Sequence, residues 1–534
     1  MTALQATMRS AQAGTRPSLP RQPFRWGQVH SAPAQLDTAP LPLPPSAGRP
    51  RMSPCRAEEG GGAGPQRTLP NPFSLPVMDD HGLDLSDENV LQLKSLRDSL
   101  ERRDSPFLPT NNAGGGFVGD KDLCLLNTMV FEGPHSSGSS CQGGIYNSDE
   151  EVCVPLPDYA IRSGPRASIY FQPEKVTAAI VTCGGLCPGL NDVVQNIVYT
   201  LADYGVPTDQ IFGIKYGLRG FYDRATKPVH LTPDIVDGIQ LRGGTILGTS
   251  RGGADMKEIV KRIKLWGVNQ LYVVGGNGGN AAANAIDKEC TAQGVHCSVV
   301  GVPKSIDNDI LLIDKCFGFE TSVERSQTAL MAAKVEARST RRGIGLVKLM
   351  GRSSGFITMQ ASMASGVVDI CLIPEVKFTL KKLVDYVTKI VNTKGHCVVC
   401  VAEGAGQDIA EEMAQEQAHN TGADASGNPI LRDIGLLLRG VFRKEIDCDL
   451  KYIDPSYMIR ASPTITTDRI YCKVLGQGAV HGAFAGYTGF TVGLVNTHYV
   501  LLPIGVIIQA PRTVDPLGRS YNRLITAINQ PSLL

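Results

Sequence analysis

The chain has 534 residues, and its 52 Lys and Arg nearly balance its 51 Asp and Glu. This balance excludes a protein that binds nucleic acid through a dominant basic field, and no apolar run is long enough for a membrane-spanning helix. The 42% of apolar residues are typical of a globular protein, and the length alone suggests three or four domains. The 58 glycines are an excess that indicates tight turns or close backbone approaches to a ligand.

Residues 1–73 differ in composition from the rest of the chain. They hold 13 of the 34 prolines and eight arginines but no lysine, and their first acidic residue is Asp37. Few positions could enter a core, so we predict a disordered segment. An Arg-rich, Ser-containing and acid-poor start is typical of an organelle transit peptide. A disordered tail without a targeting role is the alternative.

Residues 74–160 are interpreted as an N-terminal extension that lies on a domain rather than as a domain. Apolar residues near helical spacing predict one helix from Asp84 to Arg103. Gly-, Asn- and Ser-rich runs at 111–116 and 136–140 are typical of loops. Cys141 and Cys153 flank a loop-like extension and could pair on oxidation, although unrelated exposed or buried thiols are the alternative.

The 14 cysteines are scattered and form no pattern of paired CxxC motifs. Cys397 and Cys400 are three residues apart within an apolar run, which predicts a buried strand. Because neighbouring strand positions point to opposite faces, this pair is expected in the core and not in a metal site. A large core with few paired cysteines indicates a reducing compartment.

From about residue 175 onward, short apolar runs alternate with helical stretches. Continuous apolar strands that alternate with helices predict an α/β fold with parallel sheets covered by helices on both faces. In such sheets ligands bind beyond the carboxyl ends of the strands. Glycine pairs or acidic residues follow five of the expected strands, which are 176–182, 271–274, 298–302, 368–373 and 397–402.

Three glycine-rich loops are candidates for phosphate binding. Gly184-Gly185 lies between a strand and a helix, where backbone N–H groups and the helix N-terminus face an anion. Arg251, between glycines, could clamp phosphate oxygens, although a solvated arginine in a surface loop is the alternative. The third loop runs from Gly275 to Asn280. None matches GxGxxG or GxxxxGK[ST], which argues against a dinucleotide dehydrogenase and a P-loop kinase.

The loop after the strand at 298–302 carries the most specific signal. Asp307 and Asp309 follow Lys304 and Ser305 there, and an aspartate at the end of a strand can take a proton from a substrate hydroxyl. An Asn/Asp turn is the alternative. Later in the chain, Tyr457 and Arg460 are three residues apart, which on one helical turn presents both to the same ligand.

Together these motifs resemble the ATP-dependent 6-phosphofructokinases, and most closely their plant and algal type. The resemblance covers about residues 161–490. It implies two Rossmann-like α/β lobes, with an ATP-binding lobe at 161–330 and a sugar-phosphate lobe with a C-terminal return at 331–534. The motifs, in chain order, are GGLCPGLN, GGTILGTSRGG, GGNGG, PKSIDND, MGRSSGFI, PE, AEGAGQ and YMIR.

The resemblance implies transfer of the ATP γ-phosphoryl group to the 1-hydroxyl of fructose 6-phosphate, a step of glycolysis that requires Mg²⁺. Asp307 would be the general base, and Asp309 would help to organise Mg²⁺ with Asn277. The nucleotide would contact Gly184, Arg251, Gly252, Gly276, Asn277, Gly278 and Gly279. The sugar phosphate would contact Ser305, Ile306, Asp307, Met350, Gly351, Arg352, Glu375, Tyr457, Met458, Ile459 and Arg460.

Gly278 favours ATP as the phosphoryl donor. Pyrophosphate-dependent relatives have an aspartate at this position, where a carboxylate would crowd and repel the phosphates of a nucleotide. Lys304 occurs in both kinds of enzyme and does not decide between them.

Three residues depart from the family pattern. Asn277 replaces the metal-associated aspartate, Gly279 replaces a hydroxyl residue, and Ser305 replaces threonine. An amide keeps an oxygen ligand but loses the charge that Mg²⁺ prefers. The chain is therefore expected to be an active kinase with a looser metal site, with a weakly active or regulatory subunit as the alternative. A non-catalytic nucleotide sensor would have no use for the Asp307–Asp309 pair.

The same resemblance predicts the setting of the enzyme. It implies an allosteric homo-oligomer, a dimer or tetramer, or an oligomer mixed with paralogous subunits. Together with the predicted transit peptide, it implies that the protein is located in the chloroplast, with the cytoplasm as the alternative. Neither nucleic acid nor membrane is expected as a partner.

Overall fold

The computed structural model describes residues 89–107, 116–128, 144–147, 152–413 and 430–534. The segment predicted as a transit peptide, 1–73, lies outside these ranges, as does Cys141, and only the backbone of Cys153 is described. The domain boundaries given above stay a prediction.

The larger of two main sheets has nine strands. Its five central strands, in the order β9-β8-β11-β12-β18, are parallel, while antiparallel partners close both edges. The predicted parallel α/β architecture is thus confirmed for the centre of this sheet. In spatial order the strands are β10 (Val229–His230), β9 (Ile211–Ile214), β8 (Ala178–Thr182), β11 (Gln270–Gly275), β12 (Ser298–Pro303), β18 (Phe490–Val495), β19 (His498–Pro503), β6 (Tyr159–Arg162) and β3 (Leu123–Leu125).

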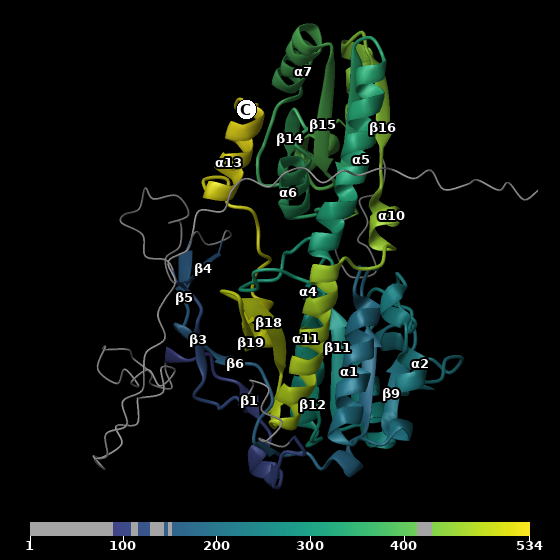
Figure 1. Cartoon of the computed structure of the whole chain (residues 1–534), viewed down its shortest axis with the longest axis vertical. Coiled ribbons are helices and arrows are strands. Elements are labelled where there is room, and N and C mark those ends of the chain that lie inside the picture. Colours follow the sequence, from purple (N-terminus) through teal and green to yellow (C-terminus); the bar gives the residue numbers. More distant parts are fainter. Residues whose placement is uncertain (1–88, 108–115, 129–143, 148–151, 414–429) are drawn as a thin grey trace, which may run out of the picture. The chain divides into compact units, whose positions relative to one another are not determined.

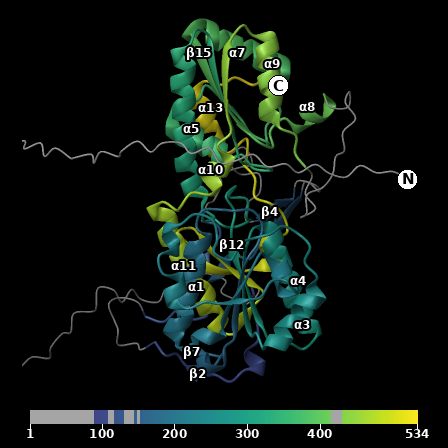
Figure 2. The same ribbon diagram turned by 90° about the vertical axis from the view of Figure 1, so that its right-hand side faces the viewer.

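Helices cover both faces of this sheet, as Figure 2 shows. Successive side chains of β8 point to opposite sides: Ala178 and Ile180 enter the core beneath two helices, while Ala179 and Val181 enter the core beneath two others. Burial on both faces explains why the strand is continuously apolar. The first pair of helices is α1 (Leu190–Tyr204) and α11 (Thr466–Phe484), and the second is α3 (Met256–Trp266) and α4 (Asn277–Ala292).

The second sheet has four parallel strands, in the order β14 (Ile370–Leu372), β15 (His396–Ala402), β13 (Gly343–Leu349) and β16 (Asp449–Ile453). Cys400 on β15 packs toward α5 and α6, whereas Cys397 packs toward α7 and α9. Both thiols are fully buried, so their predicted place in the core is confirmed. These helices are α5 (Phe319–Ser339), α6 (Phe356–Ser365), α7 (Leu380–Lys394) and α9 (Ile434–Glu445). Figure 1 shows the first three beside the sheet, and Figure 2 shows α9.

The helix predicted from Asp84 to Arg103 is wrong within the described residues. From residue 89 onward this stretch forms β1 (Lys94–Ser95), a short 3₁₀ helix and β2 (Arg103–Asp104). Its leucines pack on the large core, and β1 pairs with β17 (Tyr487–Thr488) nearly 400 residues later in the chain. Tertiary pairing with the folded lobe therefore outweighs the local helical spacing.

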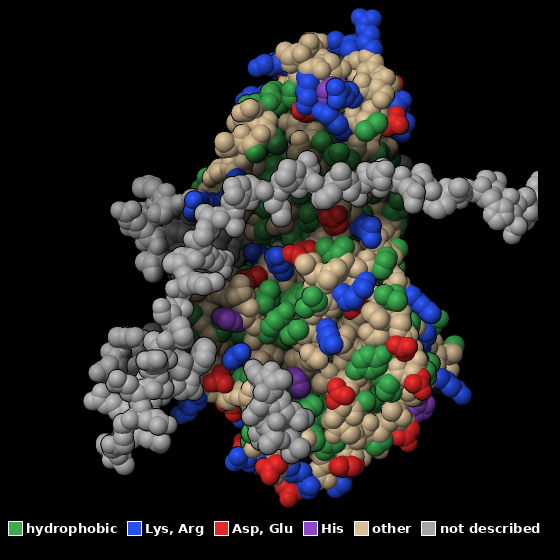
Figure 3. Space-filling model, in the orientation of Figure 1, with side chains coloured by type: hydrophobic (Ala, Val, Ile, Leu, Met, Phe, Trp, Pro, Cys, Tyr) green, Lys and Arg blue, Asp and Glu red, His purple; other side chains and the backbone are tan. Residues whose placement is uncertain are grey.

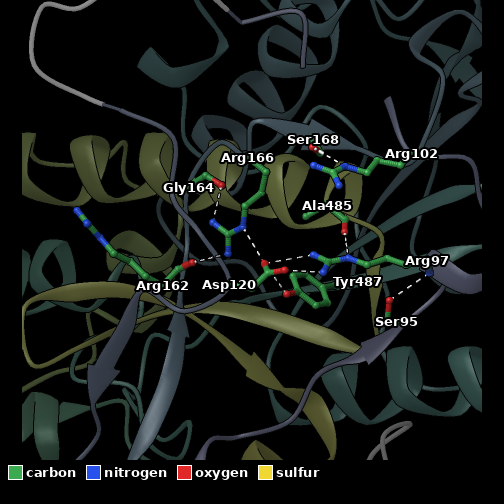
Figure 4. A network of polar contacts seen from close by, with 10 residues as sticks. All are labelled: Ser95, Arg97, Arg102, Asp120, Arg162, Gly164, Arg166, Ser168, Ala485 and Tyr487. Carbon is green, nitrogen blue, oxygen red and sulfur yellow. Dashed lines mark hydrogen bonds and ion pairs between the residues drawn. The ribbon is translucent and has the colours of Figure 1, made fainter. Parts of the chain in front are cut away.

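Asp120 links the extension to the large lobe in the network drawn in Figure 4. It forms ion pairs with Arg97 at 2.5 Å and Arg166 at 3.2 Å, and it accepts a hydrogen bond from the Tyr487 hydroxyl at 2.8 Å. Burial alone would raise the pKa of Asp120, but the bonds from Arg97 and Tyr487 lower it to about 2. The carboxylate thus stays charged and fixes the extension at neutral pH.

The remaining elements are short or peripheral. In the part of the chain that the structure describes, none of the helices could span a bilayer. Two more strand pairs are β2 with β7 (Ser168–Ile169) and β4 (Gly144–Asn147) with β5 (Val152–Pro155). The other helices are α2 (Pro233–Val236), α8 (Gln407–Glu412), α10 (Ser456–Arg460), α12 (Ile504–Ile507) and α13 (Arg519–Ile528).

Candidate active site

Two adjoining cavities lie beyond the carboxyl ends of the parallel strands, where the alternation of strands and helices predicts a ligand site. We call the larger, of about 640 Å³, the aspartate cavity, and the other, of about 540 Å³, the glycine cavity. Both are open to solvent at one side of the strand ends. They share six lining residues: Gly185, Arg251, Gly276, Gly278, Lys304 and Arg352.

The aspartate cavity brings together side chains from both sheets. Lys304 follows β12 of the large sheet, while Met350, Glu403 and Asp454 follow β13, β15 and β16 of the small one. Twelve of the predicted site residues line this cavity: Arg251, Gly276, Asn277, Gly278, Ser305, Ile306, Asp307, Asp309, Met350, Arg352, Tyr457 and Arg460.

The glycine cavity has a more apolar wall, to which Leu218, Met256 and Ala282 contribute. At its inner end α4 begins at Asn277, so that the first N–H groups of this helix have no partner within the helix and attract an anion. The predicted residues that line it are Gly184, Arg251, Gly252, Gly276, Gly278, Gly279 and Arg352.

Asp307 combines a buried, unpartnered oxygen with a raised pKa. Among the described residues, nothing donates a hydrogen bond to its Oδ1. Burial and then the charges of Asp309 and Glu403 raise its pKa to about 7, against the opposite effect of Lys304. A carboxylate with this pKa and a free oxygen can accept a proton near neutral pH.

Asn308 holds the backbone between the two aspartates in an unusual conformation. Its φ of 59° is left-handed, which is uncommon for a residue other than glycine. Its buried side chain donates to the Asp314 carbonyl at 3.2 Å and accepts from the Cys316 N–H at 2.7 Å. Sequence reasoning missed this role, although an asparagine between two aspartates is a residue that tolerates this conformation.

Asn277 contacts Asp309 directly. Its amide nitrogen donates to Asp309 Oδ2 at 3.0 Å, and Ser305 donates to Asp309 Oδ1. The amide oxygen of Asn277 is buried and has no partner among the described residues. Within the described ranges, no three side chains of the types His, Cys, Asp or Glu lie together in a way that could hold a metal ion. The side-chain oxygens of Asn277 and Asp309 are of the ligand types that Mg²⁺ accepts.

Four predicted sugar-binding residues line neither cavity. Glu375 Oε1 instead accepts the backbone N–H groups of Gly355 at 3.0 Å and Val514 at 2.7 Å. Ile459 is buried in the core, and Met458 is 77% exposed. The fourth, Gly351, has a φ of 131°, and a Cβ there would lie 2.5 Å from the Ser354 carbonyl oxygen, so its place in the loop requires glycine.

The structure adds cavity residues that sequence reasoning left out. Lys348 forms ion pairs with Asp433 at 2.8 Å and Asp454 at 2.9 Å, which raise its pKa against the effect of burial. Its position before Met350-Gly351-Arg352 was the available signal. Ile508 to Pro511, in contrast, enter the cavity wall from the C-terminal segment, and their sequence, Ile-Gln-Ala-Pro, carries no such signal.

Charges of both signs are interspersed over the lower part of the face drawn in Figure 3, around the large sheet. This agrees with the formal net charge of +1. On this face, therefore, neither sign of charge predominates.

Comparisons with known proteins agree on one family. The phosphofructokinase family model matches residues 177–483, more than half of the chain. The ATP-dependent 6-phosphofructokinase 5, chloroplastic, of Arabidopsis thaliana is 48% identical over 80% of this chain and 78% of its own length. The ATP-dependent 6-phosphofructokinase of Amycolatopsis methanolica is 39% identical over 83% of this chain and 96% of its own.

Among solved structures, the pyrophosphate-dependent phosphofructokinase of Marinobacter aquaeolei has a TM-score of 0.55 at 18% identity, over 67% of this chain and 91% of its own. At that identity the likeness concerns the fold alone. The phosphofructokinase of Pichia pastoris gives 0.52 at 22% identity, over 63% of this chain and 36% of its own. The motifs, the fold and these relatives lead to one conclusion: the chain belongs to the phosphofructokinase family.

Proposed function

We propose that the chain transfers the γ-phosphoryl group of ATP to the 1-hydroxyl of fructose 6-phosphate, which gives fructose 1,6-bisphosphate and ADP in glycolysis. The observation that carries this proposal is the position of Asp307, which lines a cavity that adjoins a glycine-lined one and has a buried oxygen without a partner among the described residues. The relatives named ATP-dependent 6-phosphofructokinase support the same activity.

The two cavities divide the substrates between them. The nucleotide would occupy the glycine cavity, with its base against Leu218 and Met256 and its phosphates at the start of α4. The sugar phosphate would occupy the aspartate cavity, whose cations include Arg352 and Arg460. Because Lys304 lines both cavities, it lies where the transferred group would pass.

The chemical step requires one base and several cations. Asp307 would take the proton of the sugar 1-hydroxyl. The hydroxyl oxygen would then form a bond to the γ-phosphorus of ATP, while the bond between that phosphorus and the ADP oxygen would break. Lys304, Arg251 and Arg352 would neutralise the charge of the transferred group. Asp309 is held by Asn277 and Ser305 and would orient the site rather than accept the proton.

Asn277 and Asp309 would hold Mg²⁺ through their side-chain oxygens, together with the phosphates of ATP. Bound there, Mg²⁺ supplies positive charge to the phosphate oxygens. The roles of the individual residues follow from their places in the cavities and from the motifs. The weakly active, regulatory subunit is the less favoured hypothesis, because the relatives that support the assignment carry the names of active kinases.

We also propose a plastid setting and an oligomeric state. The chloroplastic relatives from Arabidopsis thaliana, at 48% and 47% identity, support the first, with the cytoplasm as the alternative. A homo-oligomer and allosteric control follow only from the family, while a cleaved transit segment also rests on the Arg-rich, acid-poor composition of residues 1–73.

The proposed reaction is tested by offering the purified protein ATP and pyrophosphate separately, each with fructose 6-phosphate and Mg²⁺. We expect fructose 1,6-bisphosphate with ATP and at least ~100-fold less with pyrophosphate, because the glycine cavity suits a whole nucleotide. Product formation is measured by a coupled assay. Equal turnover with both donors would contradict the donor assignment, and no turnover with ATP would favour the regulatory hypothesis.

Asn277→Asp tests the metal assignment. The change removes the amide that donates to Asp309 and places two carboxylates about as close as the present 3.0 Å contact. Two adjacent carboxylates repel until a cation binds between them, so we expect the free Mg²⁺ needed for half-maximal turnover to fall by roughly tenfold. Thermal unfolding should become Mg²⁺-dependent as well.

The matched control is Asn522→Asp, the same change at an exposed position of α13, where the amide donates to a backbone carbonyl and not to a carboxylate. It should leave the Mg²⁺ dependence unaltered. If Asn277→Asp behaves like this control, Asn277 does not face the metal.

A further inference from the structure

The segment after α12, from Ile508 to Val514, crosses the loop that carries the two aspartates. Its first four residues form part of the aspartate-cavity wall. The N–H of Arg512 then donates to the Asp309 carbonyl at 2.8 Å, and the N–H of Val514 donates to Glu375 at 2.7 Å. The segment is thus tied to the catalytic loop on one side and to the start of α6, through Glu375, on the other.

The side chain of Arg512 reinforces this attachment. Its Nη1 donates to the carbonyls of Ile313 and Asp314, each at 2.8 Å, and its guanidinium lies 4.9 Å from the centre of the Phe356 ring. In the described part of the chain, no carboxylate forms an ion pair with it. Burial lowers the pKa of the Arg512 guanidinium, and the charge of Asp314 offsets this effect only in part. Because its loss of hydration is not fully compensated, global stability is a weak reason for its presence.

Arg512 and Asn308 hold the same point of the loop from two sides. The Asp314 carbonyl accepts both the Asn308 amide at 3.2 Å and Arg512 Nη1 at 2.8 Å. Two residues of this loop, Asn308 and Leu312, have a left-handed backbone, and φ of Leu312 is 65°. Such conformations persist only where the surroundings enforce them.

We propose that Arg512 is a positioning residue for phosphoryl transfer: through Ile313, Asp314 and Asn308 it fixes the direction in which Asp307 points into the cavity. The inference rests on the proposed role of Asp307 as the base. Arg512 acts by geometry, because its contacts with this loop are hydrogen bonds to backbone carbonyls. A displacement of about 1 Å at a reacting group can cost about 100-fold in rate.

The test compares Arg512→Met, which removes the donors at similar length, with Arg512→Lys and with Arg519→Met as the matched control. Arg519 is exposed at the start of α13. For Arg512→Met we expect kcat to fall roughly 10- to 100-fold, while KM for ATP and the stoichiometry of ADP binding by calorimetry stay at wild-type values. Lysine keeps a cation that reaches the carbonyls and should restore part of the rate. Arg519→Met should match the wild type.

Unchanged kcat in Arg512→Met overturns the inference. So does a loss of rate that merely parallels a loss of ADP-binding stoichiometry, because that result marks a role in folding only. If the methionine variant does not fold, Arg512→Lys decides: a several-fold lower kcat at full stoichiometry supports positioning, and a wild-type kcat overturns it. Failure of the base assignment is recognised separately, by an Asp307→Asn variant that keeps its turnover.

Discussion

Asp307→Asn is expected to lower kcat by about 1,000-fold, within the range that a general base contributes. The amide keeps the size of the side chain but cannot accept the proton of the sugar hydroxyl. Because Asp307 lines the aspartate cavity and not the glycine cavity, binding of ATP should be little affected. Steady-state kinetics with separate variation of ATP and fructose 6-phosphate measures both effects.

Asp209→Asn is the matched control for this variant. Asp209 is exposed and distant in sequence from every motif, so the control should retain full turnover. A fall of less than about tenfold in Asp307→Asn would be too small for the loss of a general base, and it would move the proton-accepting role to another group.

The same assignment predicts the pH dependence of the reaction. A base acts only when ionised, and the pKa of Asp307 is raised to about 7, so kcat/KM for the sugar phosphate should decline as the pH falls through 7. Glu403 contributes to this raised pKa through its charge, so Glu403→Gln should move the decline to lower pH. A profile that is flat from pH 8 to pH 6 would contradict the raised pKa. The sugar phosphate itself titrates at about pH 6, so the decline between pH 8 and pH 7 is the part that reports Asp307.

The sequence was most informative where local pattern and tertiary burial coincide. β8, β11 and β12 are buried on both faces, so each appears as an uninterrupted apolar run that ends in a polar or glycine-rich loop. The motifs that follow these runs therefore meet in the cavities, and most of the expected site residues line them. The helix predicted from Asp84 to Arg103 was wrong for the opposite reason. Its leucines are at helical spacing, but they pack on a part of the chain that is distant in sequence.

What the sequence could not supply is the geometry between distant segments. Glu375, expected at the sugar phosphate, accepts N–H groups from Gly355 and Val514, and Val514 belongs to a segment without any motif. The contacts of Arg512 could not be predicted for the same reason, since its partners are backbone carbonyls about 200 residues earlier in the chain. Carbonyl acceptors are present at every position, so no residue type marks such a contact in advance.

Gly278→Asp is expected to raise KM for ATP by about 100-fold or more, because two unit charges 4 Å apart at the edge of a protein repel by about 4 kcal/mol. Gly278 lines both cavities in the first turn of α4, and a Cβ there meets no atom within 4 Å. The new side chain therefore fits, and an acidic residue at a helix N-terminus is favourable for the fold. The loss should consequently appear in nucleotide binding and not in stability.

Gly278→Ala separates charge from volume, since it adds the Cβ alone. With open space around that atom, KM for ATP should change by less than about threefold, and thermal unfolding should confirm that both variants fold. If alanine impairs ATP binding as much as aspartate does, volume rather than charge controls this position. If aspartate leaves KM for ATP unchanged, the phosphates of the nucleotide do not lie at the start of α4, and the donor preference must arise elsewhere in the glycine cavity.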